Sequence, residues 1–350
     1  MTLDELRDKI DSIDVKLLEL INERMEVVKQ VGDLKHKSGG AIYRPEREKE
    51  IISKMNSLNS GLLTPSAIEA LYLEIFAISR NLERPERISY LGPEGSFTHQ
   101  AAESRFGAMS DYIPLSSIKS VFKAVESGKA KYGVVPIENS TSGMVSDTLD
   151  AFQHSDVKIV SEVVLNIHLD FASNCNNLKE IKTIYSKDVA FGQCREFLEQ
   201  YGLDDVKLIP VESTVKAVKI ALEEPNSAAL CPHIAAKLYN LPILFENVED
   251  KGDNKTRFLI ISDFDNQKSP HDKTSILARV SNKPGSLVHF LRQFEDANIN
   301  LTKIESHMVG SEPLFFIDFD GHKEDETVKK ILEDNSEYIK FLGSYVKESF

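Results

Sequence analysis

The sequence predicts a multidomain protein with an all-α segment, a two-lobed α/β segment and an α+β segment of β-α-β-β-α-β order. The chain has 350 residues, more than one hydrophobic core ordinarily serves, so two or three domains are expected. Pro85 ends a helical region just before a predicted strand at 88–91, and a polar, turn-rich stretch follows at 262–272. We therefore expect domains at 1–85, 87–263 and 273–350.

The composition disfavours several classes of function. No apolar run approaches the length of a membrane span and no charged-then-apolar leader opens the chain, so we expect a cytoplasmic protein with no membrane partner. The three cysteines are odd in number and widely spaced, which argues against a disulfide framework or a zinc site. The net charge of −13 argues against nucleic acid and requires local clusters of Arg and Lys to hold any anionic substrate.

The first segment is expected to hold three helices. Thr2 and Glu5 form a capping-box signature, and apolar residues at helical spacing then continue to about residue 37. At about 1.5 Å per residue this helix would be about 50 Å long, longer than an 85-residue globule is wide. Pairing with a second copy of itself is the simplest solution. Pro45 is expected to begin a second helix, and Thr64-Pro65 a third that ends near residue 83.

Charged residues on these helices form a pattern. Arg24 and Lys35 are 11 residues apart and share one face, whereas Arg7 lies about 100° around the helix from Arg24. Arg7 therefore cannot easily serve the same pocket from the same chain, which favours a dimer. Ser79 and Glu83, spaced i and i+4, share a face of the third helix. The alternative is that these cations only form the solvated face of an amphipathic helix.

This segment resembles the all-helical chorismate mutase family in Leu6-Arg7-Asp8-Lys9-Ile10, Glu23-Arg24, Val31-Gly32-Asp33-Leu34-Lys35 and Arg47-Glu48. The resemblance implies a Claisen rearrangement of chorismate to prephenate in a site shared across an intertwined dimer. It implies these roles: carboxylate binding by Arg24, Arg47 and the partner subunit's Arg7, donation to the ether oxygen by Lys35, acceptance from the ring hydroxyl by Glu48, and support of the carboxylate side by Ser79.

Glu83 departs from that family, many members of which have Gln as a second donor to the ether oxygen. A carboxyl group donates a hydrogen bond only when it is protonated. The substitution therefore implies either a carboxyl that stays protonated in the site or a site that is weaker at neutral pH.

The middle segment alternates predicted strands and helices, which predicts mostly parallel sheets with crevices at the strand ends. The expected strands are at 88–91, 131–137, 157–167, 181–185, 206–210, 227–230 and 256–262, and the expected helices are near 97–107, 116–127, 188–201, 213–223 and 233–240. Thr256 and Arg257 stand at the mouth of the last, apolar strand. Asn139, Ser140 and Thr141 precede a predicted helix, where free backbone N–H groups would form an anion-binding nest.

Three motifs together resemble the prephenate dehydratase family over about residues 88–262: Leu91-Gly92-Pro93-Glu94-Gly95-Ser96-Phe97-Thr98, Val135-Pro136-Ile137-Glu138-Asn139-Ser140 and Asn254-Lys255-Thr256-Arg257-Phe258. The resemblance implies two lobes like those of periplasmic binding proteins, with an active site between them. The implied reaction is a decarboxylative elimination that gives phenylpyruvate and needs no metal or organic cofactor. The implied catalytic groups are Thr256, at the departing hydroxyl, and Asn139, and Glu138 is an alternative acid.

The substrate anion is expected to be held by Ser140, Thr141 and Arg257. A further family element, usually Ser-His-Pro-Gln followed by Gln-Cys, is altered here within 186–194. Ser186 and Gln193 are retained, and the resemblance implies that both form hydrogen bonds on the substrate side. The His and Pro are absent.

The last segment is expected to be ferredoxin-like, with strands at 274–280, 299–308, 313–319 and 338–346 and helices at 285–297 and 324–334. Pro284 and Gly285 open the first helix and leave its amides free to bind a carboxylate. The segment resembles an ACT regulatory domain, which in dehydratases binds phenylalanine at a domain interface. The family's Glu-Ser-Arg-Pro is here Glu305-Ser306-His307-Met308. The implied regulatory residues are Gly285, Ser286, Leu287, Glu305 and Ser306; the alternative is a domain that only dimerises.

Taken together, the resemblances imply a bifunctional chorismate mutase/prephenate dehydratase of phenylalanine biosynthesis that acts on chorismate and prephenate, is inhibited by phenylalanine and forms a homodimer or tetramer. Two alternatives stay open. One is a dehydratase whose helical segment is only a dimerisation arm, which the retained Arg7, Arg24 and Lys35 disfavour. The other is a non-enzymatic amino-acid sensor, which Thr256 and Asn139 disfavour.

Overall fold

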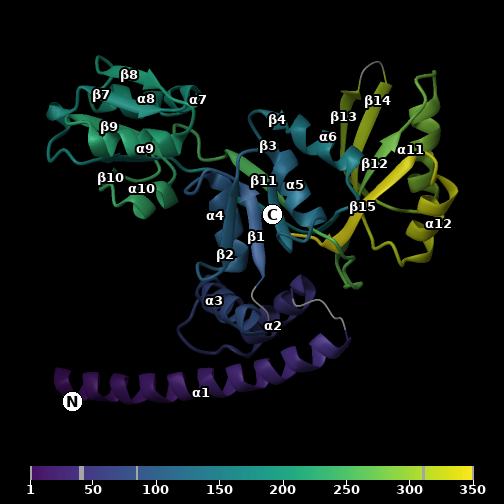
Figure 1. Ribbon diagram of the computed structural model, residues 1–350, viewed down its shortest axis with the longest axis horizontal. Coiled ribbons are helices and arrows are strands. Elements are labelled where there is room, and N and C mark those ends of the chain that lie inside the picture. Colours follow the sequence, from purple (N-terminus) through teal and green to yellow (C-terminus); the bar gives the residue numbers. More distant parts are fainter. Residues whose placement is uncertain (1, 39–42, 84–85, 310–311, 349–350) are drawn as a thin grey trace. The chain divides into compact units, whose positions relative to one another are not determined.

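The computed structural model describes residues 2–38, 43–83, 86–309 and 312–348, except for the side chains of 35–38 (Figure 1). The chain divides into two compact units, one of Met1–Glu86 with Phe106–Asp111 and one of Arg87–Arg105 with Tyr112–Phe350. We refer to them as the helical unit and the α/β unit. Among the described helices, none is both long and apolar enough to cross a membrane.

The helical unit has the three expected helices: α1 (Leu3–Ser38), α2 (Pro45–Leu58) and α3 (Pro65–Glu83). The capping box at the start of α1 is confirmed, because Thr2 N donates to Glu5 Oε2 at 2.7 Å and Glu5 N donates to Thr2 Oγ1 at 3.3 Å. At the start of α3, Ala67 N donates to Thr64 Oγ1 at 3.2 Å. The predicted start signals therefore correspond to real caps.

The long helix α1 leaves most of its apolar side chains in solvent. Gly32 gives α3 close access near the carboxyl end of α1, because a Cβ there would lie 3.0 Å from the Glu83 Cα. Towards the amino end, Leu6, Ile10 and Ile13 are 40, 56 and 52% exposed. The helix thus carries an apolar stripe that the described part of its own chain does not cover.

The first lobe of the α/β unit is a six-stranded sheet of order β2-β1-β3-β11-β5, with the short β4 paired to β3. Its strands are β1 (Arg87–Leu91), β2 (Asp111–Leu115), β3 (Tyr132–Asn139), β4 (Gly143–Met144), β5 (Lys158–Asn166) and β11 (Lys255–Ser262). Its helices are α4 (Phe97–Phe106), α5 (Ile118–Glu126) and α6 (Ser146–His154). The expectation of mostly parallel pairing is wrong at the centre, because β11 returns from the second lobe and runs antiparallel to both β3 and β5.

The second lobe is a five-stranded sheet of order β10-β6-β9-β7-β8. Its strands are β6 (Asp170–Ser173), β7 (Thr183–Ser186), β8 (Lys207–Pro210), β9 (Ser227–Cys231) and β10 (Ile243–Phe245). Its helices are η1 (Leu178–Glu180), α7 (Asp188–Gln193), α8 (Arg195–Gln200), α9 (Thr214–Glu223) and α10 (His233–Tyr239). The helix expected at 188–201 is two helices that meet at Cys194, and β2, β6 and β10 were not expected. The chain crosses between lobes twice, from β5 to β6 and from β10 to β11.

The C-terminal part forms a four-stranded antiparallel sheet of order β13-β14-β12-β15. Its elements are β12 (Asp272–Arg279), α11 (Ser286–Asp296), β13 (Leu301–Val309), β14 (Glu312–Asp320), α12 (Glu326–Asp334) and β15 (Ile339–Val346). Ile276 and Ala278 share a core with the two helices, whereas Leu277 between them belongs to a core shared with the first lobe. Each face of this sheet is therefore buried against a different neighbour, as strand alternation requires.

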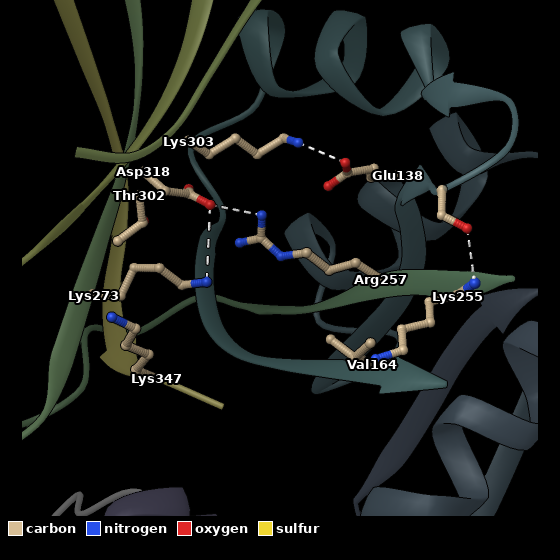
Figure 2. Close-up of a pocket in the computed structure, with 10 residues that line it drawn as sticks. Glu138, Val164, Lys255, Arg257, Lys273, Thr302, Lys303, Asp318 and Lys347 are labelled. Carbon is tan, nitrogen blue, oxygen red and sulfur yellow. Dashed lines mark hydrogen bonds and ion pairs between the residues drawn. The ribbon is translucent and has the colours of Figure 1, made fainter. Parts of the chain in front are cut away.

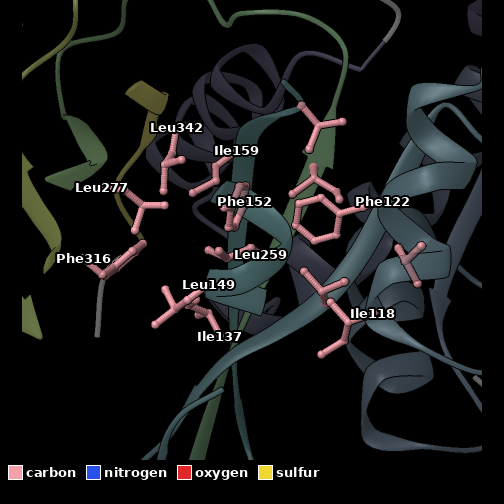
Figure 3. Packing of buried hydrophobic residues seen from close by; sticks show 14 of the residues in the cluster. Ile118, Phe122, Ile137, Leu149, Phe152, Ile159, Leu259, Leu277, Phe316 and Leu342 are labelled. Atoms are coloured by element: carbon pink, nitrogen blue, oxygen red, sulfur yellow. The ribbon is translucent and has the colours of Figure 1, made fainter. Parts of the chain in front are cut away.

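The C-terminal sheet and the first lobe share one hydrophobic core. Figure 3 shows Leu277, Phe316 and Leu342 of the C-terminal sheet beside Ile159 and Leu259 of the first lobe. The backbones also approach closely: a Cβ on Gly343 would lie 2.2 Å from the Ile159 carbonyl oxygen. These two parts therefore pack as one body rather than as domains joined by a loose linker.

Candidate active sites

Two polar side chains meet where β3 ends and β11 begins. Asn139 and Thr256 are opposite each other in the register, and the Asn139 Nδ2 donates to Thr256 Oγ1 at 2.8 Å. The same amide nitrogen lies 2.8 Å from the Asn254 Oδ1. Thr256 is 9% exposed. Because its oxygen accepts from Asn139, its own hydrogen remains available to a different acceptor.

The loop after β3 is held by the Asn139 side chain. Its Oδ1 accepts from the backbone N–H groups of Thr141 and Ser142, each at 3.0 Å. Ser140 N donates to the Lys255 carbonyl oxygen at 2.8 Å, which ties the loop to β11. This corrects the expected anion nest of free N–H groups at this turn, because Asn139 folds the loop as an Asx turn and uses two of them. Ligand contact here would fall to the side chains.

A cavity of about 210 Å³ lies between the two lobes next to this pair. It is lined by Thr141 from the first lobe, Gln193 from the second and Asn254, the residue to which Asn139 is bonded. The expected Ser186 differs: it is fully buried and its hydroxyl donates to the Leu230 carbonyl at 2.7 Å. This hydrogen bond within the sheet corrects the expectation that Ser186 contacts a ligand.

Carboxylates also line this cavity, but two of them have structural partners. The Glu249 Oε1 lies 2.5 Å from the His168 Nδ1, and its Oε2 accepts from Leu169 N at 2.9 Å. The two Asp250 oxygens accept from Arg195 N and Glu196 N at 3.0 and 2.9 Å, capping α8. Neither was predicted from the sequence. Asp250 lies more than 50 residues after the start of α8, so its role as the cap of that helix is visible only in the folded structure.

Arg257 points away from Thr256, because successive residues of a strand face opposite sides of the sheet. Its Nε donates to Glu162 at 2.7 Å, its Nη1 to Asp318 at 2.6 Å and its Nη2 to the Tyr345 hydroxyl at 2.9 Å. Burial opposes its charge, but Tyr345, Asp318 and Glu162 outweigh that effect and raise the pKa of Arg257 well above its ordinary value. The expectation that Arg257 binds substrate beside Thr256 is corrected by these contacts.

Glu138 lies on the same back face as Arg257. Its Oε1 lies 2.5 Å from the ammonium of Lys303 on β13. Figure 2 shows the two side chains pointing toward each other. The register pairs Glu138 with Arg257, one step from the Asn139–Thr256 pair. The alternative in which Glu138 is the acid is therefore corrected, because its carboxylate faces the C-terminal sheet and is ion-paired there.

The helical unit brings Arg24 of α1 and Ser79 of α3 together. The Arg24 Nη1 donates to Ser79 Oγ at 2.6 Å, and Ser79 is 6% exposed. Burial lowers the pKa of Arg24, partly offset by Tyr72 and Glu83. Since Glu83 also abuts Gly32 of α1, three of the predicted residues gather between the two helices.

The other predicted residues of the helical unit are more dispersed. Arg47 pairs with Glu50 at 3.0 Å and Arg7 with Asp4 at 3.5 Å, and both arginine side chains are about two-thirds exposed. Seventeen residues of helix put Arg7 about 25 Å from Arg24. The side chain of Lys35 lies outside the described residues. The chain alone therefore does not bring Arg7 to the Arg24 site.

Sequence reasoning missed Arg80, which forms an ion pair with the largely buried Glu48. The Arg80 guanidinium also lies 5.4 Å from the ring centre of Tyr43 and 5.5 Å from that of Phe106. Its spacing of four residues from the buried Phe76 is the signal that could have placed it on the inner face of α3. The predicted role of Glu48 stays a prediction, with Arg80 as the group that orients its carboxylate.

Comparison with known proteins identifies the family of each unit's sequence. Residues 6–84 match the family model of chorismate mutase type II and residues 88–266 that of prephenate dehydratase. A bifunctional chorismate mutase/prephenate dehydratase of Aquifex aeolicus is 43% identical over 355 residues, which cover 99% of this chain and 98% of that protein. This chain belongs to the bifunctional chorismate mutase/prephenate dehydratase family. It is thus an enzyme with a mutase and a dehydratase domain.

Two solved structures resemble the dehydratase part. A prephenate dehydratase from Arthrobacter aurescens in complex with L-Phe has a TM-score of 0.69 and 31% identity, covering 75% of this chain and 90% of that one. A protein described as a quorum quenching acylase, GqqA, has a TM-score of 0.68 and 26% identity, covering 75% and 99%. Because neighbours of this fold carry different names, the assignment of chemistry depends on the residues of the site.

In the C-terminal part of this bifunctional enzyme, Gly285 is the N-cap of α11 with φ +84°, a backbone conformation that favours glycine. The Ser286 hydroxyl lies 3.1 Å from that of Ser281, and Leu287 is half-buried. Glu305 and Ser306 are exposed on the edge strand β13. The regulatory role of these residues stays a prediction.

Proposed function

We propose that this chain rearranges chorismate to prephenate in its helical unit and converts prephenate to phenylpyruvate between the lobes of its α/β unit. We place it in the cytoplasm, as at least a homodimer that contributes to phenylalanine biosynthesis. The observation that carries the dehydratase proposal is the Asn139–Thr256 hydrogen bond beside the interlobe cavity, with Thr141 and Gln193 lining that cavity.

In the dehydratase step, the ring carboxylate leaves as carbon dioxide while the C4 hydroxyl leaves as water. The carboxylate's bonding electrons form the aromatic ring, so the departing oxygen needs a hydrogen-bond donor or proton. The Thr256 hydroxyl has a free hydrogen, and the bond it accepts from Asn139 makes that hydrogen a stronger donor. A threonine hydroxyl is too weak an acid to supply the proton itself. Thr256 therefore orients or relays it, while Thr141 and Gln193 hold the rest of the substrate.

In the mutase step, no covalent bond to the enzyme is needed. The site must bind a dicarboxylate in a compact conformer and stabilise the charge that develops on the ether oxygen. Arg24, oriented by its bond to Ser79, is suited to hold one carboxylate. Lys35 and Glu83 are assigned to the ether oxygen, Arg47 to a carboxylate and Glu48 to the ring hydroxyl.

A second copy of the chain would complete this mutase site. The uncovered apolar stripe of α1 needs a partner, and a self-complementary pairing of two α1 helices would bury it. The same pairing can bring the partner subunit's Arg7 to Arg24, which the roughly 25 Å between them prevents within one chain. The dimer and the shared site are thus one proposal.

We also propose three domains at 1–85, 87–263 and 273–350, the last an ACT-type regulatory domain of ferredoxin-like topology. Support comes from the strand order β13-β14-β12-β15 and from the open start of α11 at Gly285. The Arthrobacter relative was solved with L-Phe. We infer that phenylalanine binds here, with its carboxylate at the start of α11 and its other contacts from Leu287, Glu305 and Ser306.

Replacing Thr256 tests the dehydratase site. Thr256→Ala should lower the kcat for phenylpyruvate formation by about 10²-fold, the usual cost of losing a positioned proton-transfer group. Ser262→Ala is the matched control, because it deletes a buried hydroxyl at the other end of β11, which donates to the Lys131 carbonyl oxygen at 2.8 Å. Mutase turnover should be unchanged in both. Loss of both activities in Thr256→Ala would indicate misfolding, and full dehydratase activity would refute the site.

Calorimetry tests the regulatory domain. Wild type should bind phenylalanine. Because His307 and Met308 replace the family's Arg and Pro, we expect its affinity to be lower than the family pattern implies, or tyrosine to be preferred. Bound phenylalanine should inhibit dehydratase activity more than mutase activity. Gly285→Val should abolish binding, since valine is strained at φ +84°. If phenylalanine, tyrosine and tryptophan all fail to bind wild type at millimolar concentration, the domain is only a dimeriser.

A further inference from the structure

The proposed catalytic residues Asn139 and Thr256 each neighbour, in the sequence, a charged residue whose side chain points to the opposite face of the sheet. The register of β3 and β11 pairs Asn139 with Thr256 and, one step along, Glu138 with Arg257. Neighbouring residues of a strand point to opposite faces, so Glu138 and Arg257 form the reverse side of the catalytic pair. The two pairs are therefore joined by the same short stretches of backbone in β3 and β11.

Both back-face residues are fixed by the C-terminal sheet rather than by their own lobe alone (Figure 2). Glu138 is ion-paired with Lys303 of β13 at 2.5 Å. Arg257 donates to Asp318 of β14 at 2.6 Å and to the Tyr345 hydroxyl of β15 at 2.9 Å. Strands β13, β14 and β15 of the C-terminal sheet therefore contact the face of β3 and β11 opposite to the candidate site.

The Arg257 contacts belong to a closed network of charges. Lys273 of β12 lies 2.7 Å from Glu162 and 3.8 Å from Asp318, so two cations face two carboxylates. Burial alone would raise the pKa of Glu162, but Arg257 and Lys273 lower it below its ordinary value. In such surroundings, separating one charge from its partner leaves an uncompensated buried charge, which is strongly unfavourable. The network thus gives Arg257 one well-defined position.

The Glu138 contact has more freedom. A cavity of about 300 Å³ separates the two surfaces there and is lined by Glu138, Lys303, Arg257 and Asp318 among others. The Lys303 and Glu138 side chains are 18 and 28% exposed, against 7 and 2% for Arg257 and Asp318. The Glu138–Lys303 pair is therefore the more exposed of the two anchors, and a substitution at Lys303 leaves the buried network around Arg257 in place.

We propose that Glu138 and Arg257 are positioning residues of the dehydratase reaction. By anchoring the backs of β3 and β11 to the C-terminal sheet, they hold the Asn139 amide and the Thr256 hydroxyl in the geometry that the elimination needs. The proposal rests on the proposed function in taking Asn139 and Thr256 as the reacting pair. It also gives the C-terminal sheet a direct mechanical route to the active site, one residue away from Thr256.

The experiment changes the partner on the C-terminal sheet and leaves the lobes intact. Lys303→Met removes the ammonium but keeps an unbranched side chain, and Lys303→Arg keeps the charge. Lys340→Met is the matched control, because Lys340 also bridges the two parts, lying 3.2 Å from the Gln153 carbonyl and 3.9 Å from Asp156, but contacts neither β3 nor β11 there. Steady-state kinetics on prephenate, mutase turnover and melting temperature are measured for each.

We expect Lys303→Met to lower the dehydratase kcat about tenfold with KM within about twofold, since misplacing reacting groups by about 1 Å can cost up to 10²-fold. Lys303→Arg should restore kcat to within about twofold, and Lys340→Met should leave it unchanged. Mutase turnover should stay at the wild-type level in all three. Asp318→Asn, which weakens the Arg257 anchor, should lower kcat at least as far as Lys303→Met.

Two outcomes would overturn the proposal. The first is a wild-type kcat in Lys303→Met with only a lower melting temperature, which is the result of a purely structural contact. The second is an equal loss of kcat in Lys340→Met, which would assign the effect to domain contact in general. If Asp318→Asn does not fold, the Lys303 series decides. Activity in Thr256→Ala would instead refute the proposed site itself, so the two failures are distinguishable.

Discussion

The helical unit and the α/β unit complete their sites in different ways. In the α/β unit, adjacent strands place Asn139 and Thr256 in hydrogen-bond contact, 117 residues apart in sequence. In the helical unit, Arg7 and Arg24 lie on one continuous helix of 36 residues, about 25 Å apart along its axis, and cannot converge. A rigid helix fixes the distance between its residues, whereas strand pairing brings distant ones together. In the proposed dimer, the helical site is completed by a neighbouring chain, whereas the Asn139–Thr256 pair forms within one chain.

Burial differs between the two units in the same sense. Leu259 of β11 and Phe316 of β14 are completely buried in the core shared by the first lobe and the C-terminal sheet, whereas Ile10 and Leu17 of α1 are more than half exposed. Each such residue contributes about 1.5–3 kcal/mol when fully buried. The α/β unit thus buries these side chains within the chain, whereas the apolar side chains of α1 would be buried only in the dimer that we propose.

The largest expected effect is a loss of stability when the buried charge network of the α/β unit is disrupted. Glu162→Gln leaves Arg257 and Lys273 with one carboxylate between them, so the free energy of unfolding of the α/β unit should fall by about 3–5 kcal/mol at pH 7. Urea unfolding followed by tyrosine fluorescence measures it. Lys329→Gln on α12, whose ion pair is exposed, is the control and should change stability by less than about 0.5 kcal/mol. Equal stability of Glu162→Gln and wild type would show that the network is not stabilising.

The same variant has a pH signature. The pKa of Glu162 is lowered from its ordinary value of 4.5 in the folded protein, so its contribution is complete above that value and is lost as pH falls through the folded pKa. The stability difference between wild type and Glu162→Gln should therefore be constant near neutral pH and narrow progressively below about pH 4.5. A difference that widens in acid would contradict the sign of the shift.

On the helical side, Arg24→Ala should lower mutase kcat/KM by about 10²-fold or more, because a charged hydrogen-bond donor to the substrate is lost. Dehydratase turnover of added prephenate should be unchanged. Lys16→Ala, on an exposed part of the same helix, is the matched control and should retain mutase activity. Unchanged mutase activity in Arg24→Ala would remove the Arg24–Ser79 pair from the site.

Subunit mixing sharpens the contrast between the two sites. Arg7→Ala and Arg24→Ala each remove one group from every mutase site, but a heterodimer has one site lacking both and one site complete. Up to half of the wild-type mutase activity per heterodimer should return after exchange. Failure to recover activity after verified exchange would show that Arg7 and Arg24 do not meet across a dimer.

The smallest effect concerns Glu83. A carboxylate oxygen cannot donate a hydrogen bond to the ether oxygen, whereas the amide of Glu83→Gln can, so this variant should have a higher mutase kcat than wild type at neutral pH. Steady-state kinetics on chorismate measure the difference. Identical kcat values for the two proteins would exclude Glu83 from the ether-oxygen role.

Local signals predicted much of the fold. The caps at Thr2 and Thr64 and the N1 proline Pro45 marked the starts of the three helices, and apolar runs located most strands of the α/β unit. The direction of β11 could not be predicted, because pairing with β3 and β5 depends on the return of the chain from the second lobe. The short strands β6 and β10 have too few residues to show a period.

For the candidate sites, residue types were more predictable than orientations. Asn139, Thr256, Arg24 and Ser79 were expected from motifs, and the structure brings them together in pairs. Arg257 follows Thr256 in the sequence but faces the C-terminal sheet, an orientation set by strand alternation and by Asp318, 61 residues later. Adjacent residues of one motif can therefore serve opposite faces of the same strand.

The central claim is that one chain carries two independent sites, and feeding chorismate to Thr256→Ala tests it most directly. Prephenate should accumulate at the wild-type mutase rate, phenylpyruvate should form about 10²-fold more slowly, and added Ser262→Ala enzyme should convert the accumulated prephenate. Phenylpyruvate formed by Thr256→Ala at the wild-type rate, or a parallel loss of prephenate and phenylpyruvate in a folded protein, would contradict the account.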